Sequence, residues 1–347
     1  MRFSTPIYFI SWGCVGGHEE ADSPHREGFD FFHDEDSFGE ETFEKGESEL
    51  SRICMNFALK KSSLSPKSLE LLVAGDLQNQ CVGSSFGLYS FGVPYLPLYG
   101  ACSTCTESLL VSSMYLDCVS RDGGSHLIGA ATSSHNSAAE RQFRTPLEYG
   151  AERAPTAQWT ATAGGAFVLG SGKIPENAHA RKFPYLVCVR EALAGKMIDG
   201  SITDASNMGP AMAPAARDTL RRFFSDGRNF PSDFDAIITG DLGKVGSSLL
   251  ISLLHEDGID IENNHLDCGC MLYDEKTQDF HSGASGCGAS ASLLAALVLP
   301  KLSCGEWRRV LFSSTGALMS PTSVLQGVNI FGIAPLVLLE SHPISDL

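Results

Sequence analysis

The chain lacks a long apolar run, a regular cysteine framework and a surplus of basic residues. No apolar run in its 347 residues reaches the roughly 20 residues of a membrane-spanning helix. The opening Ile7–Ile10 is too short, and too poor in basic neighbours, for a signal peptide. The eleven cysteines have irregular spacings, which indicates free thiols in a reducing compartment. We therefore expect a soluble globular protein that stays inside the cell and is long enough for two structural units.

Basic residues are too few to balance the acids, and the net charge is −16. Residues 19–49 alone hold thirteen acids against Arg26 and Lys45. A surface of this sign repels nucleic acid and anionic lipid, so binding of either is not expected. Five phenylalanines in the same segment predict an excursion that is partly docked rather than a free tail. For Asp34-Glu35-Asp36 two interpretations stay open, a solvated acidic loop and a calcium site that lacks the usual alternating ligand spacing.

Three segments of the first half recur in the same order in the second half, which indicates an internal duplication. The pairs are 71–77 with 236–242, 100–110 with 283–294, and 125–132 with 309–316. Short apolar runs alternate with helix-like stretches in both halves, a pattern typical of α/β layers around a buried sheet. We predict an N-terminal half over 1–171 with an acidic excursion at 18–50, a connecting segment over 172–212, and a C-terminal half over 213–347.

The stretch 100–104 (GACST) places Cys102 where an apolar run meets a helix predicted over 107–119. Unpaired amides and the positive dipole end of a helix lower the pKa of a thiol and attract anions. The position therefore favours a nucleophilic thiolate or a bound acid. The alternative is a buried structural cysteine, because free cysteine packs as a small hydrophobic residue.

Two βα units related by a pseudo-twofold, with a cysteine at the start of the first central helix, resemble the thiolase and ketoacyl-synthase superfamily over nearly the whole chain. This resemblance implies a layered α/β/α/β/α architecture. A family of thiolase-like proteins of endospore-forming bacteria is similar, nearly letter for letter, at 75–80 (GDLQNQ), 100–104 (GACST), 131–144 (ATSSHNSAAERQFR), 208–216 (MGPAMAPAA) and 240–246 (GDLGKVG).

The resemblance to this sporulation family implies a binder of dipicolinic acid, with calcium as a candidate companion, that helps move the acid into the developing spore. It further implies other sporulation channel proteins as partners. A homodimer is expected because the fold usually pairs through its central sheets. The expected location is cytoplasmic, or peripheral at the spore inner membrane.

A thiolase-type condensation needs a nucleophilic cysteine and His or Asn groups that polarise the thioester carbonyl. Where a ketoacyl synthase has its His, this chain has Gly240-Asp241, and where it has Asn, the chain has Ala284-Ser285. A carboxylate there has the wrong sign for a developing oxyanion. We therefore expect a degenerate site in a protein that is not an enzyme, and the alternative is an acyl transferase that uses Cys102.

A binder of a pyridine dicarboxylate needs cationic donors, helix N-termini and a partner for the ring. Residues 134–149 contain such groups, although Glu140 and Glu148 could equally hold the two arginines in surface ion pairs. The predicted ligand-binding residues are Cys102, His135, Asn136, Arg141 and Arg144, together with Asp76, Asn79 and Asp241 from the motifs that carry the resemblance.

The remaining groups of cysteine and glycine residues are weaker evidence for a functional site. Cys102 and Cys105 form a CxxC that Cys268, Cys270 and Cys287 could extend to a zinc site, and a dithiol redox role is a further alternative. No second CxxC or His pair supports a metal, and the glycines at 164–165 lack the spacing of a dinucleotide site. Neither a metal nor a cofactor is predicted.

Overall fold

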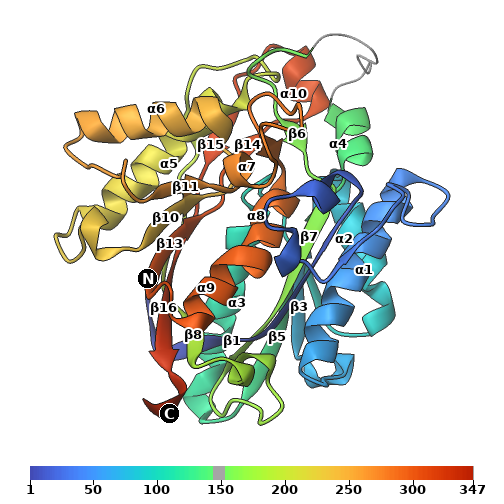
Figure 1. Cartoon of the computed structure of the whole chain (residues 1–347), viewed down its shortest axis with the longest axis vertical. Helices are drawn as coiled ribbons and strands as arrows, with labels where there is room; N and C mark the ends of the chain where they lie inside the picture. Colours follow the sequence, from blue (N-terminus) through green and yellow to red (C-terminus); the bar gives the residue numbers. More distant parts are fainter. Residues whose placement is uncertain (144–152, 347) are drawn as a thin grey trace.

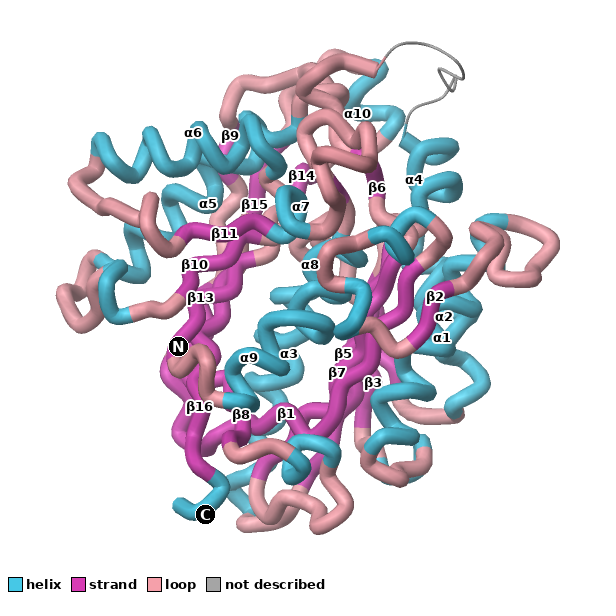
Figure 2. Tube along the Cα trace, viewed as in Figure 1, coloured by secondary structure: helices cyan, strands magenta, loops and turns pink. Residues whose placement is uncertain are grey.

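The computed structural model describes residues 1–143 and 153–346. Its main sheet contains two sets of five strands, which Figure 2 shows in magenta. The first set runs β1 (Arg2–Gly16), β7 (Ala163–Ser171), β5 (His126–Ser134), β3 (Leu71–Gly75) and β4 (Tyr95–Pro97). The second set runs β8 (Tyr185–Leu193), β16 (Leu336–Pro343), β13 (Arg309–Ser313), β10 (Ala236–Thr239) and β11 (His265–Asp267).

The two sets repeat the same directions, with two antiparallel pairings followed by two parallel ones. They meet where β1 pairs antiparallel with β8, so a pseudo-twofold relates them. The internal duplication predicted from the sequence is thus reproduced in the order of the strands in the sheet. The second set begins with β8, inside the segment 172–212 that was expected only to connect the halves.

Helices form the other layers, and Figure 1 shows α3 and the run α8–α9 between the two strand sets. Helices α1 and α2 cover the outer side of the first set, and α5 and α6 cover that of the second. The bounds are α1 (Phe43–Lys61), α2 (Val82–Leu88), α3 (Thr104–Val119), α4 (Asn136–Phe143), α5 (Met208–Phe224), α6 (Gly243–Glu256), α7 (Cys268–Met271), α8 (Cys287–Leu293), α9 (Leu299–Cys304) and α10 (Pro321–Leu325).

Alternation along the strands explains the layers. In β13, Val310 and Phe312 belong to the large central cluster, whereas Leu311 between them packs in the cluster that contains Leu220 and Leu250 of α5 and α6. Because successive side chains of a strand point to opposite faces, a strand that is apolar at every position is covered on both faces.

The run Cys287–Cys304, which comprises α8, a π-turn and α9, is long and apolar enough to cross a membrane. It is also 78% buried inside the molecule, as the core helix of a soluble protein would be. Length and composition are therefore weak grounds for a membrane span here.

The acidic segment is docked on the protein, as its phenylalanines indicated. It contains β2 (Phe31–Phe32), which pairs with β1, and it buries Glu20 and Phe38. The Glu20 carboxylate accepts hydrogen bonds from Tyr273 Oη at 2.5 Å and from the Thr162 amide at 3.1 Å. The segment therefore contacts both halves.

Two small sheets complete the fold, and the first of them connects the two halves. The first pairs β6 (Trp159–Thr160) with β12 (Ala284–Ser285), and the second has the order β14 (Gly316–Leu318), β15 (Phe331–Ile333) and β9 (Ile198–Asp199).

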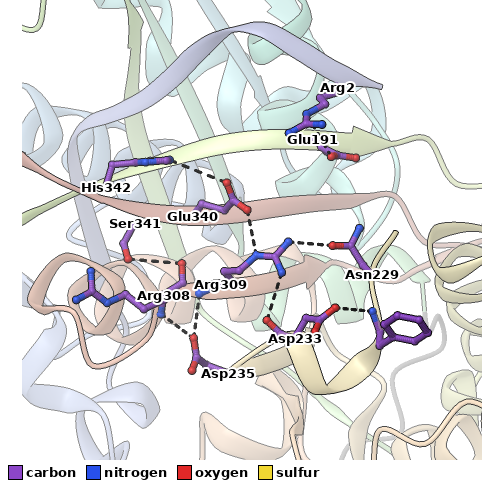
Figure 3. Close-up of polar contacts among 11 residues, drawn as sticks. Arg2, Glu191, Asn229, Asp233, Asp235, Arg308, Arg309, Glu340, Ser341 and His342 are labelled. Carbon is purple, nitrogen blue, oxygen red and sulfur yellow. Dashed lines mark hydrogen bonds and ion pairs between the residues drawn. The ribbon is translucent and has the colours of Figure 1, made fainter. Parts of the chain in front are cut away.

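Polar contacts at the other end of the second set fix β10 against β13 (Figure 3). The Asp235 carboxylate accepts hydrogen bonds from the amides of Arg308 and Arg309, at 2.7 and 2.9 Å. The Arg309 guanidinium reaches Glu340 on β16 at 3.0 Å.

Candidate functional site

Cys102 lies directly before α3 and is 6% exposed. The residue before it, Ala101, has a φ of 51°, in the left-handed region that residues with a Cβ rarely adopt. Such backbone strain persists only where the surrounding structure holds it, and it is frequent at functional sites. The turn therefore holds the thiol in one place at the junction of the two halves.

Asp241, at the end of β10, faces this thiol from the second half. Its carboxylate accepts hydrogen bonds from the Gly286 amide at 2.8 Å, the Thr315 hydroxyl at 2.8 Å and the Ser285 hydroxyl at 3.3 Å. The same carboxylate acts electrostatically on the Cys102 thiol. Gly286 has a φ of 97°, and a Cβ there would lie 2.7 Å from Ser134 Oγ, so this position requires glycine.

Burial and the Asp241 carboxylate together raise the pKa of the Cys102 thiol well above its ordinary value. Burial likewise raises the pKa of Asp241 to about 7, although its hydrogen bonds oppose that shift. Of the interpretations left open for this position, a nucleophilic thiolate is disfavoured, because desolvation and a neighbouring acid outweigh the helix dipole.

A small cavity of about 40 Å³ opens beside Cys102, between the two halves. Parallel pairing of β6 with β12 places Thr160 of the first half next to Ser285 of the second. The cavity is lined by Leu77, Ala101, Cys102, Ala139, Glu140, Phe143, Thr160, Met208, Ser285, Ala317 and Met319. It is an apolar space with a polar end at Cys102, Ser285, Thr160 and Glu140.

The structure does not bring His135 and Asn136 into this cavity lining. The His135 ring donates from Nε2 to the Asp36 carbonyl at 2.5 Å, and burial lowers its pKa. The Asn136 side chain donates to the Thr160 carbonyl at 3.2 Å. Both residues therefore attach neighbouring segments, His135 the acidic segment and Asn136 the strand β6.

Arg141 also lies apart from the cavity lining. Its guanidinium forms an ion pair with Glu44 at the start of α1. The side chain is 52% exposed. Arg144 lies outside the described residues. Glu140, by contrast, lines the cavity and accepts a hydrogen bond from Thr160 Oγ1 at 3.2 Å.

Asp76 is the counterpart of Asp241 in the first half, but it bonds within its own half. Its carboxylate accepts from the Ser84 amide and hydroxyl, both at 2.6 Å, and from the Gln78 amide at 2.8 Å. Asn79 is exposed, and its amide donates to the Gln142 side chain at 2.8 Å. Of the predicted set within the described residues, the structure brings together Cys102 and Asp241.

Sequence reasoning passed over Thr160, Phe143, Met319 and Thr315 as parts of the site. The duplication held a signal for Ser285, which occupies in the second half the place of Cys102 in the first. Thr315 likewise follows β13, in the repeat of 125–132. Phe143 and Met319 belong to no motif, since an apolar lining residue looks like any core residue in a sequence.

Comparisons with known proteins agree with the fold. By overall structure the chain is similar to 3-oxoacyl-[acyl-carrier-protein] synthase III from Aquifex aeolicus VF5, with a TM-score of 0.55 and 14% identity over 96% of this chain and 99% of that one. It is also similar to the E117D variant of OleA from Xanthomonas campestris bound with cerulenin, with a TM-score of 0.59 and 12% identity over 98% of both chains. Likenesses at this level of identity show the thiolase-like fold.

At the level of sequence, the profile of Stage V sporulation protein AD (SpoVAD) matches residues 1–340. Stage V sporulation protein AD of Bacillus subtilis (strain 168) is 38% identical over 338 residues, which cover 97% of this chain and 95% of that protein. The chain therefore belongs to the Stage V sporulation protein AD family.

Proposed function

We propose that this chain is a non-catalytic binding protein for dipicolinic acid, that the Cys102 cavity is its ligand site, and that it supports uptake of the acid into the developing spore. Membership of the sporulation family and the thiolase-like fold support the proposal. The observation that carries its non-catalytic part is the Asp241 carboxylate beside the Cys102 thiol.

A condensing reaction requires a thiolate and groups that stabilise negative charge on the thioester oxygen. Here the groups that act on the thiol are the Asp241 carboxylate, the Gly286 amide and the Ser285 hydroxyl, and both of these donors also donate to Asp241. A carboxylate opposes both the thiolate and the developing oxyanion. The arrangement therefore favours a site that holds a ligand over one that forms a covalent intermediate.

The lining fits one end of a small aromatic acid. Phe143, Met208 and Met319 can pack against a ring, and hydroxyl groups lie at the polar end. A water needs about 10–15 Å³ of such a cavity, so the present 40 Å³ is smaller than a ring with two carboxylates. Binding therefore requires the partly exposed side chains of Phe143, Met208 and Met319 to move. No Lys or Arg is among the described lining residues, and charge recognition in this proposal falls to Arg144, next in sequence to Phe143.

The proposal includes assembly. Exposed apolar side chains surround the edge strand β4, namely Phe86, Tyr89, Leu96 and Tyr99. An exposed strand edge with such neighbours is suited to pairing with another chain. We propose that a second copy of this chain pairs with this edge, which gives a homodimer. We further propose that other stage V sporulation channel proteins are partners at the spore inner membrane.

Titration of dipicolinate into the protein by calorimetry tests the ligand. The longer side chain of Cys102→Met would occupy the cavity, so we expect it to weaken binding at least about tenfold, which corresponds to about 1.4 kcal/mol. Cys118→Met, at the exposed far end of the same helix, is the matched control and leaves the affinity unchanged. Absence of binding to the wild-type protein, or equal affinity in both variants, contradicts the proposal.

The alternative function is acyl transfer through Cys102, which the condensing-enzyme neighbours favour. Incubation with a panel of acyl-CoA thioesters, followed by mass spectrometry, separates the two. We expect no turnover in the wild-type protein. Multiple turnovers that disappear in Cys102→Ser would establish the transferase.

A further inference from the structure

We infer that Gln158 is a positioning residue of the Cys102 cavity, and that its side-chain amide fixes the second-half segments at the polar end of the cavity against the first half. Gln158 does not line the cavity itself, so it acts through the residues that do. Groups that touch a ligand are held in place by hydrogen bonds from residues behind them. This role rests on the proposed function, which takes the cavity as the ligand site.

The Gln158 side chain bridges two main-chain carbonyls of the second half. Its Nε2 donates to the Asp241 carbonyl at 2.8 Å and to the Ala284 carbonyl at 2.8 Å. Asp241 follows β10, and Ala284 lies on β12 directly before the cavity residue Ser285. Gln158 itself is 2% exposed and precedes β6 of the first half. One buried amide therefore joins two separate segments of the second half to the first.

Main-chain hydrogen bonds next to this bridge bring the polar lining residues together. The Trp159 amide donates to the Gly283 carbonyl at 2.9 Å. The Ala161 amide donates to the Ser285 carbonyl at 2.9 Å. These bonds place Thr160 beside Ser285, one hydroxyl from each half. The Gln158 bridge lies at the start of this pairing.

The contacts form a closed ring around Ser285. Gln158 holds the main chain of Asp241 and of Ala284. The Asp241 carboxylate in turn accepts from the Ser285 hydroxyl at 3.3 Å and from the Gly286 amide at 2.8 Å. Ser285 is thus fixed from two directions, and both depend on the Gln158 amide.

The surroundings of the amide are built to admit it. Gly243 has a φ of 64°, and a Cβ there would lie 2.9 Å from Gln158 Nε2 and 2.4 Å from the Ser282 carbonyl oxygen, so this position requires glycine. Within the described part of the chain, no donor reaches Gln158 Oε1. A buried acceptor without a partner destabilises a fold. A side chain that served packing alone would not carry that penalty.

The test compares two side-chain amides that each bridge a pair of main-chain carbonyls. Gln158→Met keeps the length of the side chain and removes the donors, together with the unpaired acceptor. Asn264→Leu is the matched control, because Asn264 Nδ2 donates to the carbonyls of Pro231 at 2.8 Å and Phe234 at 2.9 Å. These contacts lie before β10, at the opposite end of the strand from Asp241, and outside the cavity lining.

The readout is the rate at which iodoacetamide alkylates Cys102 at pH 8, measured by peptide mass spectrometry relative to Cys54 in the same sample. Both thiols are buried, and Cys54 belongs to the central cluster outside the cavity lining. Global unfolding exposes both cysteines, whereas a loosened cavity exposes Cys102 alone. The ratio of the two rates therefore separates positioning from overall stability.

In Gln158→Met we expect the Cys102-to-Cys54 ratio to rise at least about fivefold, and the affinity for dipicolinate by calorimetry to fall at least about tenfold. Asn264→Leu should leave both quantities within about twofold of the wild-type values. An unchanged ratio in Gln158→Met, or an equal rise in Asn264→Leu, overturns the inference. So does an unchanged affinity in Gln158→Met when the wild-type protein binds.

Should Gln158→Met fail to fold, Gln158→Asn is read by the same criteria, since its shorter side chain cannot reach both carbonyls. The labelling assay contains no dipicolinate. It therefore decides the role of Gln158 even if the wild-type protein does not bind this acid, which would be a failure of the proposed function alone.

Discussion

At the scale of single residues, two buried carboxylic acids face each other beneath the site. Glu47 of α1 and Asp76 at the end of β3 are both fully buried. A Cβ on Gly83 would lie 3.1 Å from Glu47 Cδ and 3.2 Å from Asp76 Cγ, so both carboxyl groups flank this glycine. Burial, and then the charge of Asp76, raise the pKa of Glu47, and burial raises that of Asp76. Like charges this close cannot both ionise without a cost in free energy.

A raised folded-state pKa adds stability below the unfolded-state pKa, and this stability is lost as the pH rises through the folded-state value. We therefore expect Glu47→Gln to unfold at a higher temperature than the wild-type protein at pH 8, and this advantage to shrink towards pH 5. Glutamine cannot bind the proton that the folded protein holds at Glu47. The slope of the unfolding free energy against pH should therefore decrease by up to about 1.4 kcal/mol per pH unit. Thermal melts across this pH range measure the effect.

Glu44→Gln, one helical turn earlier, is the control with the opposite sign. Burial raises the pKa of Glu44, but the hydrogen bond from Arg141 and other contacts outweigh it, and the net shift is downward. Its contribution is present above the unfolded-state pKa and is lost as the pH falls. If both variants gain stability at pH 8, the buried pair is not the cause.

Arg141 gives a second prediction at this scale. Because its guanidinium pairs with Glu44 rather than lining the cavity, Arg141→Ala should change dipicolinate affinity less than about twofold. The loss of stability should be small too, since exposed ion pairs contribute about 0.2–1 kcal/mol. Calorimetric titration and a denaturant melt check both. A tenfold loss of affinity would place the arginine in the ligand site after all.

At the scale of elements, the acidic segment is attached by contacts that cannot be predicted from its composition. Glu20 and His135 both use their polar atoms to hold it, one through Tyr273 and the other through the Asp36 carbonyl. Burial raises the pKa of Glu20 to about 7 in spite of the hydrogen bond from Tyr273. Burial of Glu20 therefore reduces the stability of the folded protein as the pH rises through neutrality, and the hydrogen bond from Tyr273 opposes this loss.

Tyr273→Phe removes the hydroxyl and leaves the buried Glu20 with one donor fewer. We expect a loss of about 1–3 kcal/mol of unfolding free energy, larger at pH 8 than at pH 5 because the hydrogen bond stabilises the ionised carboxylate. Faster hydrogen exchange or proteolysis within residues 17–42 would locate the effect. Tyr89→Phe, on a ring that is 86% exposed, is the control and should change neither. Equal protection of the segment in both variants would show that Glu20 is not its anchor.

The sequence indicated the elements and much of their order, but only part of the site. Repeats such as 71–77 with 236–242 report local apolar patterning, and the sheet reproduces them as β3 and β10. The partners of Arg141 and His135 come from residues about a hundred positions away, Glu44 and Asp36, and no local pattern encodes such contacts. The pKa of Cys102 depended in the same way on Asp241, whose distance from the thiol only the folded chain sets.

At the scale of the whole molecule, the duplicated sheet ends at β11 on one side and at β4 on the other. Around β4 lie Phe86 and Tyr89, 74% and 86% exposed, with Leu96 on the strand itself. Proteins usually blunt a free strand edge with charge or cover it, so an apolar edge calls for a partner.

If two copies pair through β4, a charge on that strand should separate them. We expect the wild-type protein to be a dimer at micromolar concentration by light scattering, and Leu96→Lys to be a monomer with an unchanged fold by circular dichroism. Lysine on an edge strand opposes pairing because two copies would bury like charges without partners. Leu325→Lys, which alters a leucine that is 85% exposed on α10, is the matched control and should remain dimeric. A monomeric wild-type protein, or dissociation in both variants, would rule out pairing through this edge.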